Sequence, residues 1–193
     1  MIRNALSISS RLLLGLAATL ALAGCGFHLR DSLALPDDTP PVRVISTTPY
    51  SELVTILERN LRNAGARVAD AEAKGEFARL EVVSERWGDL PIAIDERGRA
   101  QEFSLRYATI FSFRLADGTE LVPQQSVELA RDYVSPPEDA TGTSTEREIL
   151  ADELRREMAA SILRRVDSVV RADQAKARAE APAGSGVPPS STP

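Results

Sequence analysis

Histidine and cysteine are almost absent from this chain. There is one of each, His28 and Cys25, among 193 residues. A Ser-His-Asp or Cys-His catalytic site needs a histidine inside the fold, and a zinc site needs a cluster of such ligands. No glycine-rich phosphate loop precedes a Lys-Ser or Lys-Thr pair. We therefore expect no catalytic residue, no metal site and no cofactor, and a binding or structural protein rather than an enzyme.

An excess of basic charge and a long apolar run are also missing. Lys and Arg total 23 against 28 Asp and Glu, which gives a formal net charge of −5. Such a balance does not favour nucleic acid as a partner. The apolar run at residues 12–23 is shorter than the about 20 residues that a membrane-spanning helix requires. We expect neither a nucleic-acid partner nor a spanning helix.

The apolar run instead belongs to a targeting segment. Arg3 and Arg11 supply positive charge, and no acidic residue appears before residue 31. Residues 22–25 read Leu-Ala-Gly-Cys, the lipobox pattern of bacterial lipoproteins. The alternative is a buried free thiol in an N-terminal helix, but the charged start, the apolar run and the lipobox agree. We expect residues 1–24 to be a removed signal peptide and Cys25 to carry the lipid.

Lipid on Cys25 also predicts where the protein resides. Several acyl chains on one cysteine anchor a protein firmly, whereas a single chain holds it only marginally. Gly26 follows the cysteine, and no Asp stands there to act as an inner-membrane retention signal. By analogy with enterobacterial lipoproteins, we expect a lipid-anchored protein on the periplasmic side of the outer membrane.

Composition divides the mature chain into three parts. Residues 25–41 form a lipidated N-terminus and tether, and residues 42–172 are long enough for a single domain. Residues 173–193 are rich in Ala, Pro, Gly and Ser and have too little bulky apolar content to bury. We expect this last part to be a disordered tail.

The domain opens with a strand, a helix and a second strand. A short strand at residues 42–45 is followed by Thr48-Pro49, a pattern typical of a helix N-cap with proline in the first turn. Leu and Ile then recur at steps of three and four residues, and Gly65 follows as the expected C-cap. With a strand at about residues 78–86, this order predicts a β-α-β opening.

A period of two over residues 100–116 predicts a long strand with one face in the core. Its length exceeds that of ordinary strands, so we expect a bend or bulge. Residues 95–99, Asp-Glu-Arg-Gly-Arg, are expected to form the tip of a hairpin that follows residues 92–94. Asp117-Gly118 predicts a second hairpin turn, and Pro123 suggests that its partner strand lies at an edge.

The last element is a long amphipathic helix. Residues 145–148, Thr-Glu-Arg-Glu, have the capping-box pattern of a helix start. Leu150, Leu154, Met158, Ile162 and Val166 follow at steps of four and predict a buried stripe in which Met158 belongs to the core. The fold class that results is α+β, with two helices packed on one face of a mostly antiparallel four-stranded sheet.

The start of the mature chain resembles a known family. Residues 25–31 read Cys-Gly-Phe-His-Leu-Arg-Asp directly after the lipobox, as in the LPS-assembly lipoprotein family LptE. The order of elements and the last helix are also similar to those of that family. The chemistry of His28, Leu29 and Arg30 cannot be derived from the sequence; a role in export or in contact with a barrel is open.

The resemblance implies a specific role. It implies an outer-membrane lipoprotein that plugs the LptD β-barrel in a one-to-one complex, helps that barrel assemble and aids insertion of lipopolysaccharide into the outer leaflet. Basic residues of the family are associated with lipopolysaccharide binding, and Arg97 matches an Arg next to the hairpin glycine. Arg99 and Arg106 are further candidates. The alternative interpretation, which the sequence favours, is that all three are solubilising charges of a turn and an edge strand.

Two other roles remain compatible with the sequence. A lipoprotein subunit of another outer-membrane assembly machine, or a secretion pilotin, would share the lipobox but have a different partner. A free periplasmic carrier of an amphiphile would need an apolar cavity, which strands with one polar face do not favour.

Overall fold

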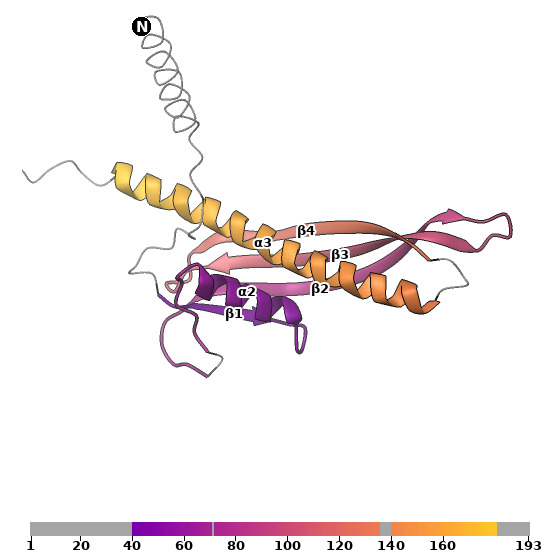
Figure 1. Cartoon of the computed structure of the whole chain (residues 1–193). Coiled ribbons are helices and arrows are strands. Elements are labelled where there is room, and N and C mark those ends of the chain that lie inside the picture. The colour runs from indigo at the N-terminus through magenta and orange to yellow at the C-terminus, as the bar shows by residue number, and fades with distance from the viewer. Residues whose placement is uncertain (1–39, 71, 136–139, 181–193) are drawn as a thin grey trace, which may run out of the picture. The chain divides into compact units, whose positions relative to one another are not determined.

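The computed structural model describes residues 40–70, 72–135 and 140–180. The predicted signal peptide, Cys25 and His28 lie outside the described residues. Among the residues described, no helix is long and apolar enough to cross a membrane. The elements, with the labels of Figure 1, are β1 (Val42–Ser46), α2 (Glu52–Asn63), β2 (Ala78–Ile94), β3 (Ala100–Arg114), β4 (Glu120–Val134) and α3 (Ala140–Glu180).

The strands form one mixed sheet in the order β1-β2-β3-β4. β1 is parallel to β2, while β2, β3 and β4 are antiparallel to their neighbours. Both helices lie over the same face of the sheet (Figure 1). The expected α+β class, with two helices on one face of a mostly antiparallel four-stranded sheet, is confirmed.

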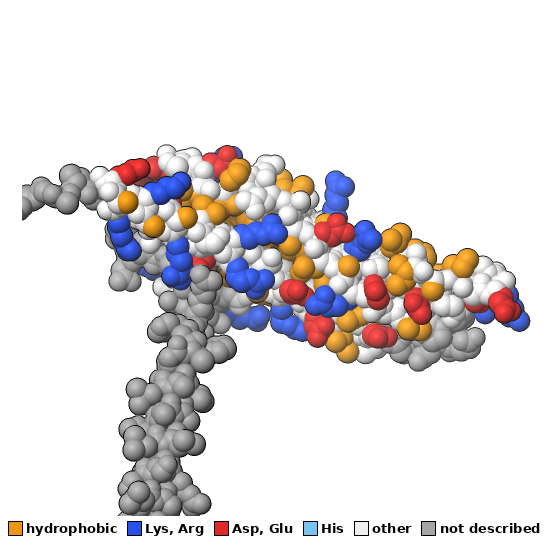
Figure 2. Space-filling model, turned by 90° about the horizontal axis from the view of Figure 1, so that it is seen from above, with side chains coloured by type: hydrophobic (Ala, Val, Ile, Leu, Met, Phe, Trp, Pro, Cys, Tyr) orange, Lys and Arg blue, Asp and Glu red, His pale blue; other side chains and the backbone are white. Residues whose placement is uncertain are grey.

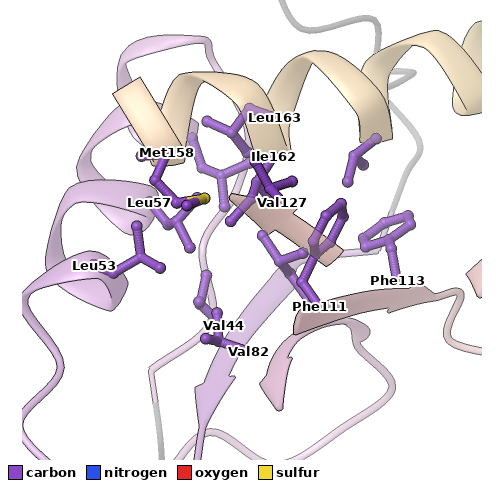
Figure 3. Packing of buried hydrophobic residues seen from close by; sticks show 14 of the residues in the cluster. Val44, Leu53, Leu57, Val82, Phe111, Phe113, Val127, Met158, Ile162 and Leu163 are labelled. Carbon is purple, nitrogen blue, oxygen red and sulfur yellow. The ribbon is translucent and has the colours of Figure 1, made fainter. Parts of the chain in front are cut away.

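The core lies between that face and the two helices. Figure 3 shows Leu53 and Leu57 of α2 beside Met158 and Ile162 of α3, above the sheet residue Phe111. All five side chains are 0% exposed, so Met158 is a core residue as predicted. Burying a side chain of this size contributes about 1.5–3 kcal/mol.

Both helices begin at residues other than the predicted ones. Ser51, rather than Thr48, caps α2: its side chain accepts a hydrogen bond from the Val54 amide, which leaves Thr48 and Pro49 in the preceding turn. α3 begins at Ala140, ahead of the capping box predicted at Thr145. The C-terminal end of α2 agrees with the prediction: Gly65 follows the Ala64 C-cap with a left-handed φ of 83°.

Two predicted strands are in fact one. Residues 78–86 and 92–94 belong to the single 17-residue strand β2, because β3 is long enough to pair with all of it. Register shifts interrupt the pairing at Val82/Ser84 and beyond Pro91, and β3 shifts against β4 at Phe111/Phe113, so the predicted irregularity of the long strand is confirmed. At the other end of the domain, α3 continues to Glu180. The domain boundary at residue 172 remains a prediction.

Candidate functional site

The turn between β2 and β3 is built around one carboxylate. Oδ1 of Asp95 accepts hydrogen bonds from the backbone amides of Arg97 (2.9 Å) and Arg99 (2.8 Å). Gly98 closes the turn with a φ of 76°, which a residue with a side chain rarely adopts. The predicted hairpin tip at residues 95–99 is therefore confirmed as a turn.

The same carboxylate distinguishes the two candidate arginines of the turn. The Arg99 guanidinium donates to Oδ2 of Asp95 at 2.8 Å, and Gln101 donates to the same oxygen at 3.2 Å. Hydrogen bonds from Arg99, first its backbone amide and then its side chain, hold the pKa of Asp95 below its usual value. The Arg97 side chain is exposed and makes no ion pair with any residue that the structure describes. Arg97 is thus available to an anionic ligand, whereas Arg99 stabilises the turn.

Arg106 lies apart from the turn. It stands opposite Gly88 in the sheet, whereas the pair next to the turn is Ile94 with Ala100. Its guanidinium forms an exposed ion pair with Glu128 at 3.3 Å, on the face of the sheet that the helices leave open. The structure therefore brings Arg97 and Arg99 together but does not bring Arg106 to them.

Exposed apolar side chains accompany the turn. Ile94 is 68% exposed, Ile92 47% and Leu90 46%, and Val134 at the end of the neighbouring strand is 54% exposed. Figure 2 shows charged side chains together at the end of the domain formed by the β2–β3 turn, with hydrophobic side chains beside them. An apolar patch next to a cation suits a ligand that is both anionic and apolar. From the sequence, residues 92–94 were predicted only as a strand. Ile92 and Ile94, two apolar residues directly before a charged turn, could have indicated the exposed apolar surface beside it.

Hydrogen bonds and an ion pair connect the base of this hairpin to the N-terminal part of α3. Arg147 donates to both carboxylate oxygens of Asp89, at 3.0 and 2.8 Å, and the Tyr133 hydroxyl donates to Oδ1 at 3.0 Å. The hydrogen bond from Arg147 lowers the pKa of Asp89 below its usual value. Burial, followed by the hydrogen bond to Asp89, raises the pKa of Tyr133. One carboxylate therefore joins β2, β4 and α3.

A second polar cluster joins α2 to the sheet. The Glu85 carboxylate accepts hydrogen bonds from Tyr107 (2.6 Å) and from Ser51, the N-cap of α2. Burial, followed by the hydrogen bond to Glu85, raises the pKa of Tyr107 above its usual value. The Tyr107 ring stacks on Trp87 at 3.9 Å between centroids. This cluster positions β2 and was not predicted, because its members are far apart in the sequence.

No metal site is evident among the described residues, where no three His, Cys, Asp or Glu side chains gather.

Comparison with known proteins gives relatives along most of the chain. The chain is 27% identical over 167 residues to the LPS-assembly lipoprotein LptE of Photorhabdus laumondii, an alignment covering 86% of this chain and 90% of the relative. The LPS-assembly lipoprotein LptE of Pectobacterium atrosepticum is also 27% identical, over 86% of this chain and 89% of the relative.

Solved structures show the same fold. The lipoprotein B structure from Nitrosomonas europaea matches with a TM-score of 0.60 and 26% identity, over 76% of this chain and 94% of that one. The rare lipoprotein B structure from Shewanella oneidensis matches with a TM-score of 0.61 and 23% identity, over 69% and 98%. The sequence model of the family LptE, described as lipopolysaccharide-assembly, matches residues 40–166, which include five of the elements and most of α3. This chain belongs to the lipopolysaccharide-assembly family LptE.

Proposed function

We propose that this protein is an outer-membrane lipoprotein that forms a one-to-one complex with the LptD β-barrel. In that complex it plugs the barrel, helps it assemble and aids insertion of lipopolysaccharide into the outer leaflet. The observation that carries the proposal is the family match over residues 40–166, which spans nearly all of the folded domain. The match favours this role over that of a secretion pilotin or a subunit of another assembly machine.

The anchor in this proposal is a lipid on Cys25, which holds the domain on the periplasmic side of the membrane. The lipobox at residues 22–25 supports it, as does the word lipoprotein in the names of the relatives. Residue 25 precedes the folded domain by a short tether, so the lipid can remain in the membrane while the domain occupies a barrel lumen. A lumen lined by polar side chains suits the charged, helix-free face of the sheet.

The contact with lipopolysaccharide is proposed to lie at the β2–β3 turn. Lipopolysaccharide carries anionic groups on an apolar body, and arginine binds such groups with two parallel hydrogen bonds. Arg97 supplies an exposed guanidinium, and Ile92 and Ile94 supply exposed apolar surface beside it. Arg99 acts by holding the turn through Asp95, and Arg106 is engaged with Glu128.

The proposal is tested by detergent extraction from the outer membrane with an affinity tag on residues 181–193. We expect a large barrel protein at one-to-one stoichiometry together with lipopolysaccharide. Recovery of the lipoprotein alone, or with components of a secretion machine, would contradict the proposed function.

The same extraction tests the turn when it is repeated with Arg97→Ala. We expect the barrel to be recovered as before and the bound lipopolysaccharide to fall by about tenfold, which corresponds to the loss of one charge-assisted contact. Arg164→Ala, a change at an exposed position of α3, serves as the matched control. If the complex with Arg97→Ala retains as much lipopolysaccharide as the parent, the turn is not part of the proposed binding site.

A further inference from the structure

The two edge strands of the sheet differ in how many of their outward backbone groups are bonded by neighbouring side chains. On β4, the edge strand at one side, Arg165 of α3 donates to the carbonyl oxygen of Ser126 at 3.1 Å. Arg131 donates to the carbonyl oxygen of Ala130 at 2.9 Å. When an arginine donates a hydrogen bond to a carbonyl oxygen that faces away from the sheet, another strand cannot pair with that oxygen. The β4 edge is therefore blocked at two points.

The other edge is only partly covered. β1 pairs with β2 from Ala78 to Val82, and Thr47 extends this cover by donating to the carbonyl oxygens of Val82 (3.2 Å) and Val83 (2.6 Å). Between that point and Ile94, no residue in the described part of the chain pairs with the outer side of β2. Among the described residues, the second half of β2 is therefore an unpaired strand edge.

The register identifies the outward backbone groups. The amide of Ser135 donates to the carbonyl of Gln101, so the odd-numbered residues of β3 bond to β4 and the even-numbered ones bond to β2. Arg106 pairs with Gly88, and the register is unbroken from Ser84 to Pro91. Even-numbered residues of β2 therefore bond to β3, and the outward groups belong to Glu85, Trp87, Asp89 and Pro91.

The position of Pro91 agrees with this assignment. Proline has no amide hydrogen and is tolerated in a sheet where that hydrogen would point away from the neighbouring strand. The outward row thus consists of the amide and carbonyl groups of Glu85, Trp87 and Asp89, followed by the carbonyl of Pro91. A partner strand can therefore pair along residues 85–91 of β2.

Side chains around this edge define the chemistry of a partner. The carboxylates of Glu85 and Asp89 are already engaged, by Tyr107 and by Arg147. On the opposite face Arg86 is exposed and makes no ion pair with a described residue, and Leu90 is 46% exposed. Charge complementarity therefore favours an acidic residue beside Arg86 and an apolar residue beside Leu90.

We infer that the β2 edge from Glu85 to Pro91 adds a fifth strand, supplied by an extended segment of the barrel subunit. The inference rests on the proposed function for the identity of the partner. The backbone groups of Glu85, Trp87 and Asp89 bind the segment, and Arg86 and Leu90 select its side chains. Strand addition of this kind obtains affinity from the backbone and specificity from alternate side chains.

Amide hydrogen exchange tests the inference on the mature full-length protein, purified alone and in complex with the barrel. We expect the amides of Trp87 and Asp89 to exchange at least about tenfold more slowly in the complex, whereas the outward amides of β4 do not change. A complex without protection of β2 would overturn the inference and leave the proposed function intact. Absence of any complex would overturn both.

The same measurement distinguishes a second copy of the chain from the barrel. Protection of β2 in the protein alone, increasing with protein concentration, would identify a second copy as the occupant and overturn the inference.

A pair of variants isolates the backbone contribution. Trp87→Ala removes the indole ring but keeps the outward amide, whereas Trp87→Pro removes both. We expect Trp87→Pro to bind the barrel about tenfold more weakly than Trp87→Ala, because one backbone hydrogen bond is lost. Equal binding by the two folded variants would overturn the inference. If Trp87→Pro does not fold, the exchange measurement decides alone.

Discussion

At the scale of single residues, Asp89 of β2 connects two other elements of the fold through one carboxylate. It is 32% exposed, yet it accepts hydrogen bonds from Arg147 of α3 and Tyr133 of β4. The Arg147 side chain is 40% exposed, so solvent screens part of the attraction between the two charges. The contribution of Asp89 to stability therefore comes mainly from the bidentate geometry.

We predict that Asp89→Asn lowers the free energy of unfolding at pH 7 by about 1 kcal/mol. Arg147 holds the pKa of Asp89 below its usual value of 3.8. Its contribution is therefore complete above that value and is lost as the pH falls through the lower, folded-state pKa. Urea unfolding should show the parent and Asp89→Asn converging below about pH 4.

Asp132→Asn, a change at an exposed position of β4, is the control for this prediction. It should alter the free energy of unfolding at pH 7 by less than about 0.5 kcal/mol. A gap between the parent and Asp89→Asn that does not narrow as the pH falls below 3.8 would argue against the ion pair.

The residues of the turn illustrate what a sequence can and cannot predict at this scale. The pattern at residues 95–99 predicted a hairpin tip, because Asp and Gly at those positions favour a turn wherever the strands lie. It could not separate Arg97 from Arg99, since that difference depends on which guanidinium reaches Asp95 once the turn has closed. Arg106 was predicted as a further candidate, but its ion pair with Glu128 depends on the register between β3 and β4.

At the scale of elements, α3 has two parts with different roles. Its stripe from Leu154 to Val170 is buried, whereas residues 175–180 are exposed. The periodicity predicted the buried stripe because spacing alone decides which side chains share a face. The first residue of the helix was predicted wrongly, since a capping pattern can occur inside a helix that tertiary contacts extend.

Truncation separates the two parts of α3. We predict that removal of residues 175–193 changes the free energy of unfolding by less than about 0.5 kcal/mol, because this segment contributes nothing to the described core. Removal of residues 164–193 also deletes Val166 and Val170, which are 3% and 5% exposed, and should cost about 3 kcal/mol or more. Urea unfolding measures the free energy of unfolding of both truncated proteins. An equal decrease for the two would contradict the assignment of different roles to the two parts of α3.

The β2 strand shows why element boundaries were harder to predict than element types. Residues 78–86 and 92–94 each have the composition of a strand, and residues 87–91, Trp-Gly-Asp-Leu-Pro, contain the residues that usually end one. Pairing with the long β3 continues through them. Gly88 and Pro91 are tolerated because this half of β2 is an edge.

At the scale of the whole molecule, the core of the described residues draws on side chains from Val42 to Val170. Family membership and the fold class were predictable from the sequence because each rests on local patterns, whereas the signal peptide and the lipid on Cys25 stay predictions. The partner-facing surfaces were not predictable, because they depend on which strand edges and side chains the completed sheet leaves unoccupied.

We predict that Cys25→Ala leaves the domain folded but releases it from the outer membrane. Without its lipid the chain has no acyl groups to partition into the bilayer. Membrane fractionation should find the variant in the soluble fraction, and its thermal unfolding midpoint should equal that of Arg164→Ala, which keeps the lipid. Failure of purified Cys25→Ala to fold would contradict the prediction.

The position of α3 at the end of the chain has a consequence for biogenesis. Synthesis proceeds from the N-terminus, so the sheet is available before the helix that covers Phe111, Phe113 and Val127. Until α3 emerges and docks, an aromatic sheet surface is open to solvent, and the nascent protein is most vulnerable to aggregation and proteolysis in that interval. Mutations that weaken the docking of α3 should therefore reduce the cellular abundance of the protein before they reduce the activity of the molecules that fold.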